Sequence, residues 1–377
     1  MSIIALGTNK TKYLYYLFAI LSYICRNYSE QVTGYQLKTP FKLFFMFLGM
    51  SLNLIPQCIL SSKFKDKHKI HFSQHQSVVK IMLSICGISF LDYVGFFITK
   101  IFDQPKYLYM TENQVHGLEH SHCLVEFVEI SILTFYFLKL RLKKHHIFFL
   151  SLMICGYLFI IFSNFFNDRK VTPYLIALMF RAIFYGIIII IEKWLMEYKF
   201  ISPYFLMGHM GVIGLFYTII ILIFMLAVKM DIEITIEDLK RFQEPLVLLT
   251  AFLFTIFSMG YNIFLLLINK IFGPPNRIVY ELVSIFIIFV IDLIVGNLKL
   301  ISLPEGIFLF IGNIISLFGS FGFNEIIILY ICNIQRDTEK EVLLRSTFIG
   351  NNAELPENLV LTKKKTNEIN KMLLEEI

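Results

Sequence analysis

The sequence predicts an all-α membrane protein with ten transmembrane helices in two inverted five-helix repeats. Three observations support this prediction. The 377-residue chain is 56% hydrophobic and only 16% charged, its apolar residues gather in long uncharged runs, and part of its first half recurs in its second half. Runs of about 18 or more apolar residues are typical of helices that cross a bilayer. An ordinary soluble domain is therefore excluded.

Ten apolar segments are the candidate membrane spans. The first is the least regular, because Arg26 and a polar stretch follow its apolar half. Most connections between the segments are short, which predicts neighbouring helices in one bundle. The ten segments are 13–33, 41–60, 80–101, 121–139, 147–165, 173–195, 203–229, 247–270, 277–296 and 304–332.

Basic connections predict the orientation of these helices. Connection 61–80 contains five lysines, and the stretch 139–144 contains four basic residues. Connections rich in lysine and arginine stay on the cytoplasmic side, so both termini are predicted to be cytoplasmic. The chain then divides into a cytoplasmic N-terminus (1–12), two repeats (13–165 and 173–333) and a cytoplasmic tail (334–377). Because each repeat holds an odd number of helices, the repeats have opposite orientations.

The internal similarity joins one helix pair in each half. Glu126 opens EFVEISI and Glu281 opens ELVSIFI, and each run is followed by a short loop and a second run with a central glycine. These glycines, Gly156 and Gly312, lie 30 and 31 residues after their glutamates. Two helical hairpins can resemble each other by chance, but a duplicated membrane unit predicts the same spacing.

Four further stretches carry a resemblance to a known family. They are PFKLFFMFLG (40–49), IIEKWLMEYKFISPYFLMGHMGVIG (190–214), PPNRIVYELVSIFIIFVIDL (274–293) and, more weakly, LDYVGFF (91–97). With the last hairpin, their order and spacing resemble the drug/metabolite transporter superfamily (EamA-like), and most closely the F-type branch of solute carrier family 35. The resemblance implies a transporter that moves a small polar metabolite by alternating access, without an ATP site.

The chain departs from this branch where the branch carries charged residues. Glu126 and Ser284 stand at positions of basic residues, and Met210 stands at the position of a glutamate. Because basic residues in the superfamily often meet anionic cargo, these replacements argue against a nucleotide-sugar substrate. They also leave open an alternative, in which the chain kept the fold, lost transport and acts as a structural or interaction subunit.

Ionisable residues inside apolar runs are the candidates for a substrate site. Such a group costs about 3 kcal/mol at a bilayer centre on insertion scales, so it tends to face a partner or a wet cavity. Glu281 lies in an apolar run, and Arg181 is its expected counter-charge. The predicted substrate-binding residues are Arg26, Asp92, Glu126, Glu129, Arg181, Asn262, Glu281 and Ser284.

These candidates also have a simpler interpretation. Arg181 and Glu192 are eleven residues apart, as are Glu281 and Asp292, so each pair shares one helix face. On the simpler interpretation, this shared face does not line a substrate site, because Glu192 and Asp292 lie at helix ends and reach interfacial water. Arg26 then anchors the lipid interface, and the other charges form structural ion pairs without touching cargo. Both interpretations stay open from the sequence.

Other chemistry has little support. His116-Gly-Leu-Glu119-His120 fits the H-x-x-E-H zinc motif, but it lies in a short loop and is expected to be a chance match, so no metal site is predicted. No phosphate-binding loop, dinucleotide-binding turn or extended basic surface is present in the sequence. We therefore expect no enzyme activity, no cofactor and no nucleic acid partner. The expected partners are a small-molecule substrate and a lipid bilayer, and a homodimer stays open.

The tail carries a candidate address signal. Glu339-Lys-Glu-Val-Leu343-Leu344 fits the acidic dileucine pattern E-x-x-x-L-L, which coat adaptors read on cytoplasmic tails. The pattern predicts an endomembrane location in the Golgi, endosome or lysosome. Ordinary tail sequence also produces so short a pattern.

Overall fold

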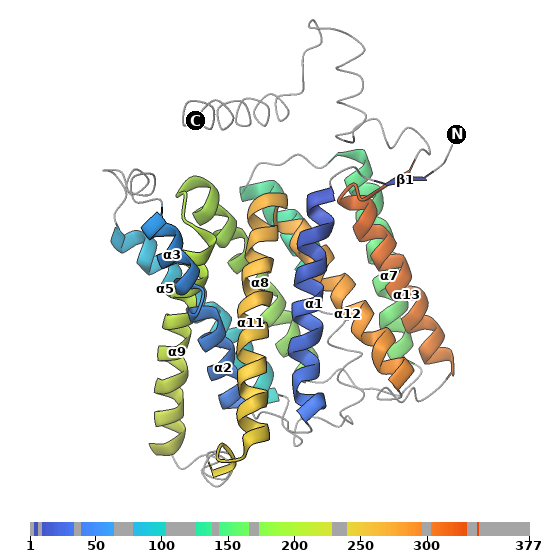
Figure 1. The fold of residues 1–377 in the computed structure, drawn as a ribbon. Helices are drawn as coiled ribbons and strands as arrows, with labels where there is room; N and C mark the ends of the chain where they lie inside the picture. Colours follow the sequence, from blue (N-terminus) through green and yellow to red (C-terminus); the bar gives the residue numbers. More distant parts are fainter. Residues whose placement is uncertain are drawn as a thin grey trace, which may run out of the picture.

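In the computed structural model, long helices form a bundle with one small two-stranded sheet at its edge (Figure 1). The structure describes residues 4–6, 10–33, 39–63, 78–102, 126–137, 143–165, 173–227, 240–295, 303–329 and 338. Both the H-x-x-E-H stretch and the dileucine pattern lie outside these residues.

A helix is present within each of the ten predicted segments. Four of them, α8, α9, α11 and α12, begin with a proline, which suits the first helical turn because its fixed φ is helical and its missing N–H is not needed there. In the first half the helices are α1 (Lys10–Thr33), α2 (Thr39–Ser51), α3 (Leu54–Lys63), α5 (Val78–Phe102), a helical segment at 126–137, and α7 (Lys144–Phe165). In the second half they are α8 (Pro173–Tyr198), α9 (Pro203–Ala227), α11 (Pro245–Phe272), α12 (Pro274–Val295) and α13 (Leu303–Phe323).

Several of these helices have the length and composition of membrane spans. Within the described ranges, four stretches are long and apolar enough to cross a bilayer: Phe41–Ile59, Pro203–Phe224, Pro245–Phe272 and Gly306–Phe323. On α9, the large side chains of Phe216, Ile220 and Ile223 share one face and are exposed. Such a face suits lipid better than water, so the apolar helices support the prediction of a membrane protein.

Two predicted segments have different boundaries in the structure. Segment 41–60 is divided between α2 and α3 at Leu52 and Asn53, where the Asn53 side-chain amide donates to the Met50 carbonyl at 3.1 Å. Asparagine competes in this way with the helical backbone. The predicted end of segment 304–332 is wrong, because α13 stops at Phe323.

The end of α13 is a closed turn. The Ile326 N–H bonds to the Phe321 carbonyl at 2.9 Å, and the Glu325 N–H bonds to the Gly322 carbonyl at 3.1 Å. Glu325 has a φ of 55°. This pair of bonds around a left-handed residue is the Schellman ending of a helix, in which glycine is the usual left-handed residue. The turn leads the chain out of the helix nine residues before the predicted end.

A small sheet follows this turn, and the prediction of a purely helical fold did not include it. β1 (Ile4–Leu6) pairs antiparallel with β2 (Ile327–Leu329), with Ile4 opposite Leu329 and Leu6 opposite Ile327. The sheet joins the start of the described chain to the segment after α13. It lies at the end of the bundle where α7 begins and α13 ends (Figure 1).

Helices from opposite halves form the main packing pairs: α13 on α7, α1 on α11, α2 on α9 and α5 on α8. Gly156 of α7 and Gly312 of α13 meet at the first of these contacts. A Cβ atom added to Gly156 would lie 2.8 Å from the Gly312 carbonyl oxygen, and one added to Gly312 would lie 2.7 Å from the Gly156 carbonyl oxygen. The two glycines of the internal similarity therefore touch, and they allow a close backbone approach.

Two hydrophobic cores share α8 and α11. Ile189 and Leu265 belong to one core, while their sequence neighbours Ile188 and Leu266 belong to the other. α8 therefore lies between the two cores, and its Glu192 and Lys193 are buried.

Candidate functional site

Arg277, in the first turn of α12, is the centre of a buried charge cluster. Its Nη1 is ion-paired with Oε2 of Glu192 on α8, and its Nη2 donates to the Tyr185 hydroxyl at 2.9 Å. One turn further along α12, Oε1 of Glu281 lies 3.5 Å from the Arg277 Nε atom. The Tyr185 hydroxyl donates to the same Glu281 oxygen at 2.5 Å. One guanidinium thus joins two carboxylates and a phenol.

These charges are removed from solvent. Glu192 is 1% exposed, Arg277 4% and Glu281 7%. A planar guanidinium suits this position because its five N–H donors can serve several acceptors at once. Glu192 has a further neighbour, since Nδ2 of Asn269 on α11 lies 3.4 Å from its Oε2 atom. The same Asn269 nitrogen donates to the Ile189 carbonyl at 3.0 Å, which ties α11 to α8.

Charged residues of the first half surround this centre. Asp92 of α5 is within electrostatic range of Arg181, Glu192 and Arg277. Glu126, in the helical segment 126–137, is within electrostatic range of Glu281, Arg181 and Arg277. The cluster therefore draws on residues from both halves of the chain.

Carboxylates outnumber guanidiniums in the cluster. Glu129 adds a further acid beside α8, because a Cβ atom added to Gly186 would lie 2.8 Å from the Glu129 carboxylate carbon. Gly186 thus provides the space that this side chain occupies. The acids are Asp92, Glu126, Glu129, Glu192 and Glu281, and the guanidiniums are those of Arg181 and Arg277. Such an excess suits a cationic or proton-carrying ligand better than an anionic one.

The predicted site residues fall into two groups in the structure. Asp92, Glu126, Glu129, Arg181 and Glu281 lie in or beside the cluster. Arg181 is within electrostatic range of Glu281, but the ion pair that holds Glu281 comes from Arg277.

The other three predicted residues have different surroundings. The Arg26 guanidinium lies over the Tyr261 ring, 4.2 Å from its centroid, which is a cation–π contact between α1 and α11. Asn262 donates to the Ser258 carbonyl at 2.9 Å, and Ser284 donates to the Tyr280 carbonyl at 2.9 Å. Both bonds lie within the residue's own helix, one turn back.

Sequence reasoning missed Arg277 and Tyr185 as members of the site. Of the two interpretations left open for Glu192, the interfacial one is wrong, because this side chain is buried against Arg277. One local signal was available: Arg277 and Glu281 are four residues apart, the spacing of an ion pair on one helix face. The side chain of Asp292 lies outside the part of the chain that the structure describes.

No family model and no curated protein matches the sequence. The structure is similar to a solved one described as "Crystal structure of protein", with a TM-score of 0.51 and 10% sequence identity. The alignment covers 84% of this chain and 96% of the other. At this identity the likeness shows a shared fold alone.

Proposed function

We propose that this protein is a membrane transporter of ten helices that moves a small polar metabolite by alternating access. The charge cluster around Arg277 is the observation that carries the proposal. Ionisable residues buried among apolar helices are expensive, and they commonly mark the path of a substrate or ion. The cluster draws on both halves of the chain, and substrates of repeat-built transporters bind between the halves.

The helix packing supports two repeats. In chain order, α1 corresponds to α8, α2 to α9, α5 to α11, segment 126–137 to α12, and α7 to α13. If each helix is replaced by its counterpart in the other half, the contact between α1 and α11 becomes the contact between α8 and α5. In the same way, the contact between α2 and α11 becomes the contact between α9 and α5. All four contacts occur.

Two further contacts, α2 with α9 and α7 with α13, map onto themselves under this exchange. A two-fold relation predicts that equivalent residues meet in such self-related pairs, and Gly156 touches Gly312. Five helices in each half would make this relation an inverted repeat.

The cargo that fits this cluster is neutral or cationic. An anionic cargo such as a nucleotide sugar would meet an excess of carboxylates, whereas an amino or hydroxyl group finds acceptors. A cargo group that bonds to Glu281 competes with Arg277 and Tyr185 and so weakens the link between α8 and α12. Such a difference in contacts is what allows a ligand to shift a protein between two states.

Uptake into liposomes by the purified protein tests the proposal. A thermal-shift screen with a metabolite library identifies the cargo first, because a ligand that binds the folded state raises its stability. We expect Glu281→Gln to keep the fold and to abolish cargo-induced stabilisation and uptake. The matched control is Glu197→Gln on α8, which removes a half-exposed carboxylate that pairs with Lys193. Normal uptake by the Glu281→Gln protein would show that the cluster is structural.

One observation favours the alternative, a transport-inactive membrane protein that acts as a structural or interaction subunit. Arg277 already bonds to three side chains, so the network could serve folding alone. In that case no metabolite would stabilise the protein and no uptake would occur, while Glu281→Gln would lower the unfolding temperature.

We further propose an endomembrane location with both termini in the cytoplasm. The lysine-rich connections and the dileucine pattern motivate this. Tags at the two ends should show equal protease sensitivity in sealed vesicles. Replacing Leu343 and Leu344 with alanine should move the protein to the cell surface, and an unchanged distribution would remove the address signal from the proposal.

A further inference from the structure

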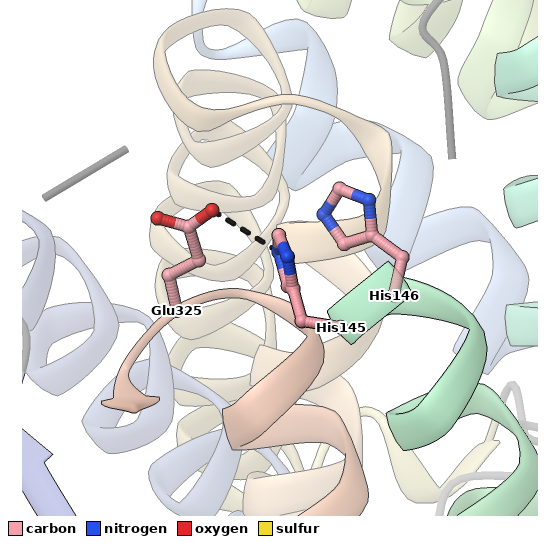
Figure 2. A group of neighbouring side chains, drawn as sticks. All are labelled: His145, His146 and Glu325. Atoms are coloured by element: carbon pink, nitrogen blue, oxygen red, sulfur yellow. Dashed lines mark ion pairs between the residues drawn. The ribbon is translucent and has the colours of Figure 1, made fainter. Parts of the chain in front are cut away.

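A second group of ionisable side chains lies apart from the charge cluster, at the end of the bundle that carries the small sheet. His145 and His146 stand in the first turn of α7, and Glu325 stands in the turn after α13. Figure 2 shows His145 between Glu325 and His146. One donor atom from each side chain lies within 4.8 Å of the other two. Because His145 and Glu325 are 180 residues apart, no sequence motif indicates this group.

His145 is buried and faces Glu325. The residue is 1% exposed, and neither Nδ1 nor Nε2 has a hydrogen-bond partner within the described ranges. Nε2 nevertheless lies 3.1 Å from Oε1 of Glu325. This is the distance of an ion pair, which Figure 2 marks, and without the direction of a hydrogen bond it also suits two atoms that face a shared metal ion. Two ligand atoms about 2.1 Å from one tetrahedral Zn²⁺ lie roughly 3.4 Å apart.

His146 supplies the third donor. Its ring lies 4.0 Å from that of His145 between centroids, and the Phe323 ring packs against it at 4.6 Å.

Binding through His146 requires the three donor atoms, now within 4.8 Å of one another, to move closer together, and it changes one hydrogen bond. The Lys143 N–H donates to Nδ1 of His146 at 3.1 Å, which leaves the ring proton on Nε2. A metal ion on Nε2 moves this proton to Nδ1, so the Lys143 amide must release the ring. This amide lies just before the first turn of α7, where water can replace the lost acceptor.

Glu325 is held in a conformation that glutamate rarely adopts. Its φ of 55° is left-handed, a region that favours glycine or asparagine. Non-glycine residues in this region often stand at functional sites, where the strain serves a purpose. The turn also places the carbonyl end of α13 beside the three side chains. The partial negative charge of this helix end favours a cation and offsets the partial positive charge at the start of α7.

We propose that His145, His146 and Glu325 bind a divalent transition-metal ion of the Zn²⁺ class. Two imidazoles and one carboxylate suit Zn²⁺, whereas Mg²⁺ and Ca²⁺ prefer oxygen ligands alone. The three ligands leave one coordination position for water. The bound ion links α7 of the first half to the end of α13 in the second half, next to the small sheet.

Zinc titration of the purified full-length protein tests this site. Competition with a chromophoric chelator should give one tight site per chain, and Zn²⁺ should raise the unfolding temperature where Mg²⁺ does not. His145→Gln and Glu325→Gln each remove one ligand and keep the side-chain size. Each should weaken Zn²⁺ binding at least about tenfold, the lower end of losses measured around metal sites.

Two controls distinguish this site from other zinc ligands in the chain. His120→Ala removes a histidine of the H-x-x-E-H stretch and should leave Zn²⁺ affinity unchanged. Glu197→Gln removes a carboxylate of α8 and should also have no effect. If His145→Gln and Glu325→Gln bind Zn²⁺ like the parent protein, or if His120→Ala alone loses binding, the proposal is overturned. Failure of transport would not affect these measurements.

Discussion

Two buried groups of ionisable side chains in the described part of the chain differ in how their central residue is bonded. In the charge cluster, Arg277 meets Glu192, Tyr185 and Glu281 at once. In the group at the end of the bundle, His145 is equally buried, yet both of its ring nitrogens lack a hydrogen bond within the described ranges. The first group is held together by its own charges. In the second group, the donor atoms of three side chains converge, and those of His145 make no hydrogen bond with the described residues.

This difference indicates what each group can do. Buried polar groups are normally hydrogen-bonded, so the two ring nitrogens of His145 need a specific explanation, and binding of a metal ion would supply one. A bonded network can bind a ligand only by exchanging one contact for another. We therefore expect the charge cluster to dominate stability, and the histidine–glutamate group to respond to an added ion.

Removing Arg277 should have the largest effect. Arg277→Met keeps much of the side-chain volume but leaves Glu192 and Glu281 buried without their guanidinium. Breaking a buried pair in this way costs about 3–5 kcal/mol, so we expect a large fall in the unfolding temperature or loss of folded protein. Thermal unfolding monitored by tryptophan and tyrosine fluorescence measures this loss of stability.

The double variant Arg277→Met with Glu192→Met sharpens this test. It removes both members of the ion pair, and buried pairs replaced by apolar residues are often tolerated. Part of the lost stability should therefore return. Equal losses in the single and double variants would mean that the ion pair contributes nothing beyond side-chain packing.

Gly312→Ala should have the next largest effect. Its Cβ atom would lie 2.7 Å from the Gly156 carbonyl oxygen, so α7 and α13 must separate. Overpacking of this kind costs about 1–3 kcal/mol. Because the histidines lie on α7 and Glu325 stands in the turn after α13, Zn²⁺ affinity should fall as well. The matched control is Gly87→Ala on α5, where nothing lies within 4 Å of the added atom, and it should be neutral or stabilising.

Tyr185→Phe should have a smaller effect on stability. It removes the hydroxyl that bridges Arg277 and Glu281 and leaves both ions in place. Hydrogen bonds to charged groups contribute about 1.5–3 kcal/mol, and the surviving ion pair should keep the loss near the lower value. Tyr198→Phe on the same helix removes an exposed hydroxyl and should change nothing. Equal unfolding temperatures for the two variants would remove Tyr185 from the network.

The helices could be predicted from the sequence because each is a long uncharged run. The charged pairs could not, because partners such as Glu192 and Arg277 are 85 residues apart and periodicity carries no information on which helices meet. Glu281 was found because it interrupts an apolar run. Arg277 was missed because it lies in the first turn of α12, where a basic residue looks like the edge of a span.

The turn after α13 shows a second reason for failure. The apolar residues that follow it continue the pattern of a span, so the predicted helix ran on to 332. No glycine marks the left-handed position, which Glu325 occupies. The β strands that follow are three residues long, too short for an alternating pattern to show. Only the fold brings β1, β2 and the two histidines to this turn.

Glu325→Gly should have the smallest effect on stability, and the opposite sign. Glycine adopts a positive φ without strain, so the variant should raise the unfolding free energy of the metal-free protein by up to about 1 kcal/mol. The same change removes the carboxylate, so Zn²⁺ should no longer stabilise the protein as it does the parent. Parallel unfolding curves with Zn²⁺ and with a chelator measure both effects. A glutamate that only closed the turn would give the first effect without the second. A Glu325→Gly protein that Zn²⁺ still stabilises as strongly as the parent would therefore show that the strained residue has no part in metal binding.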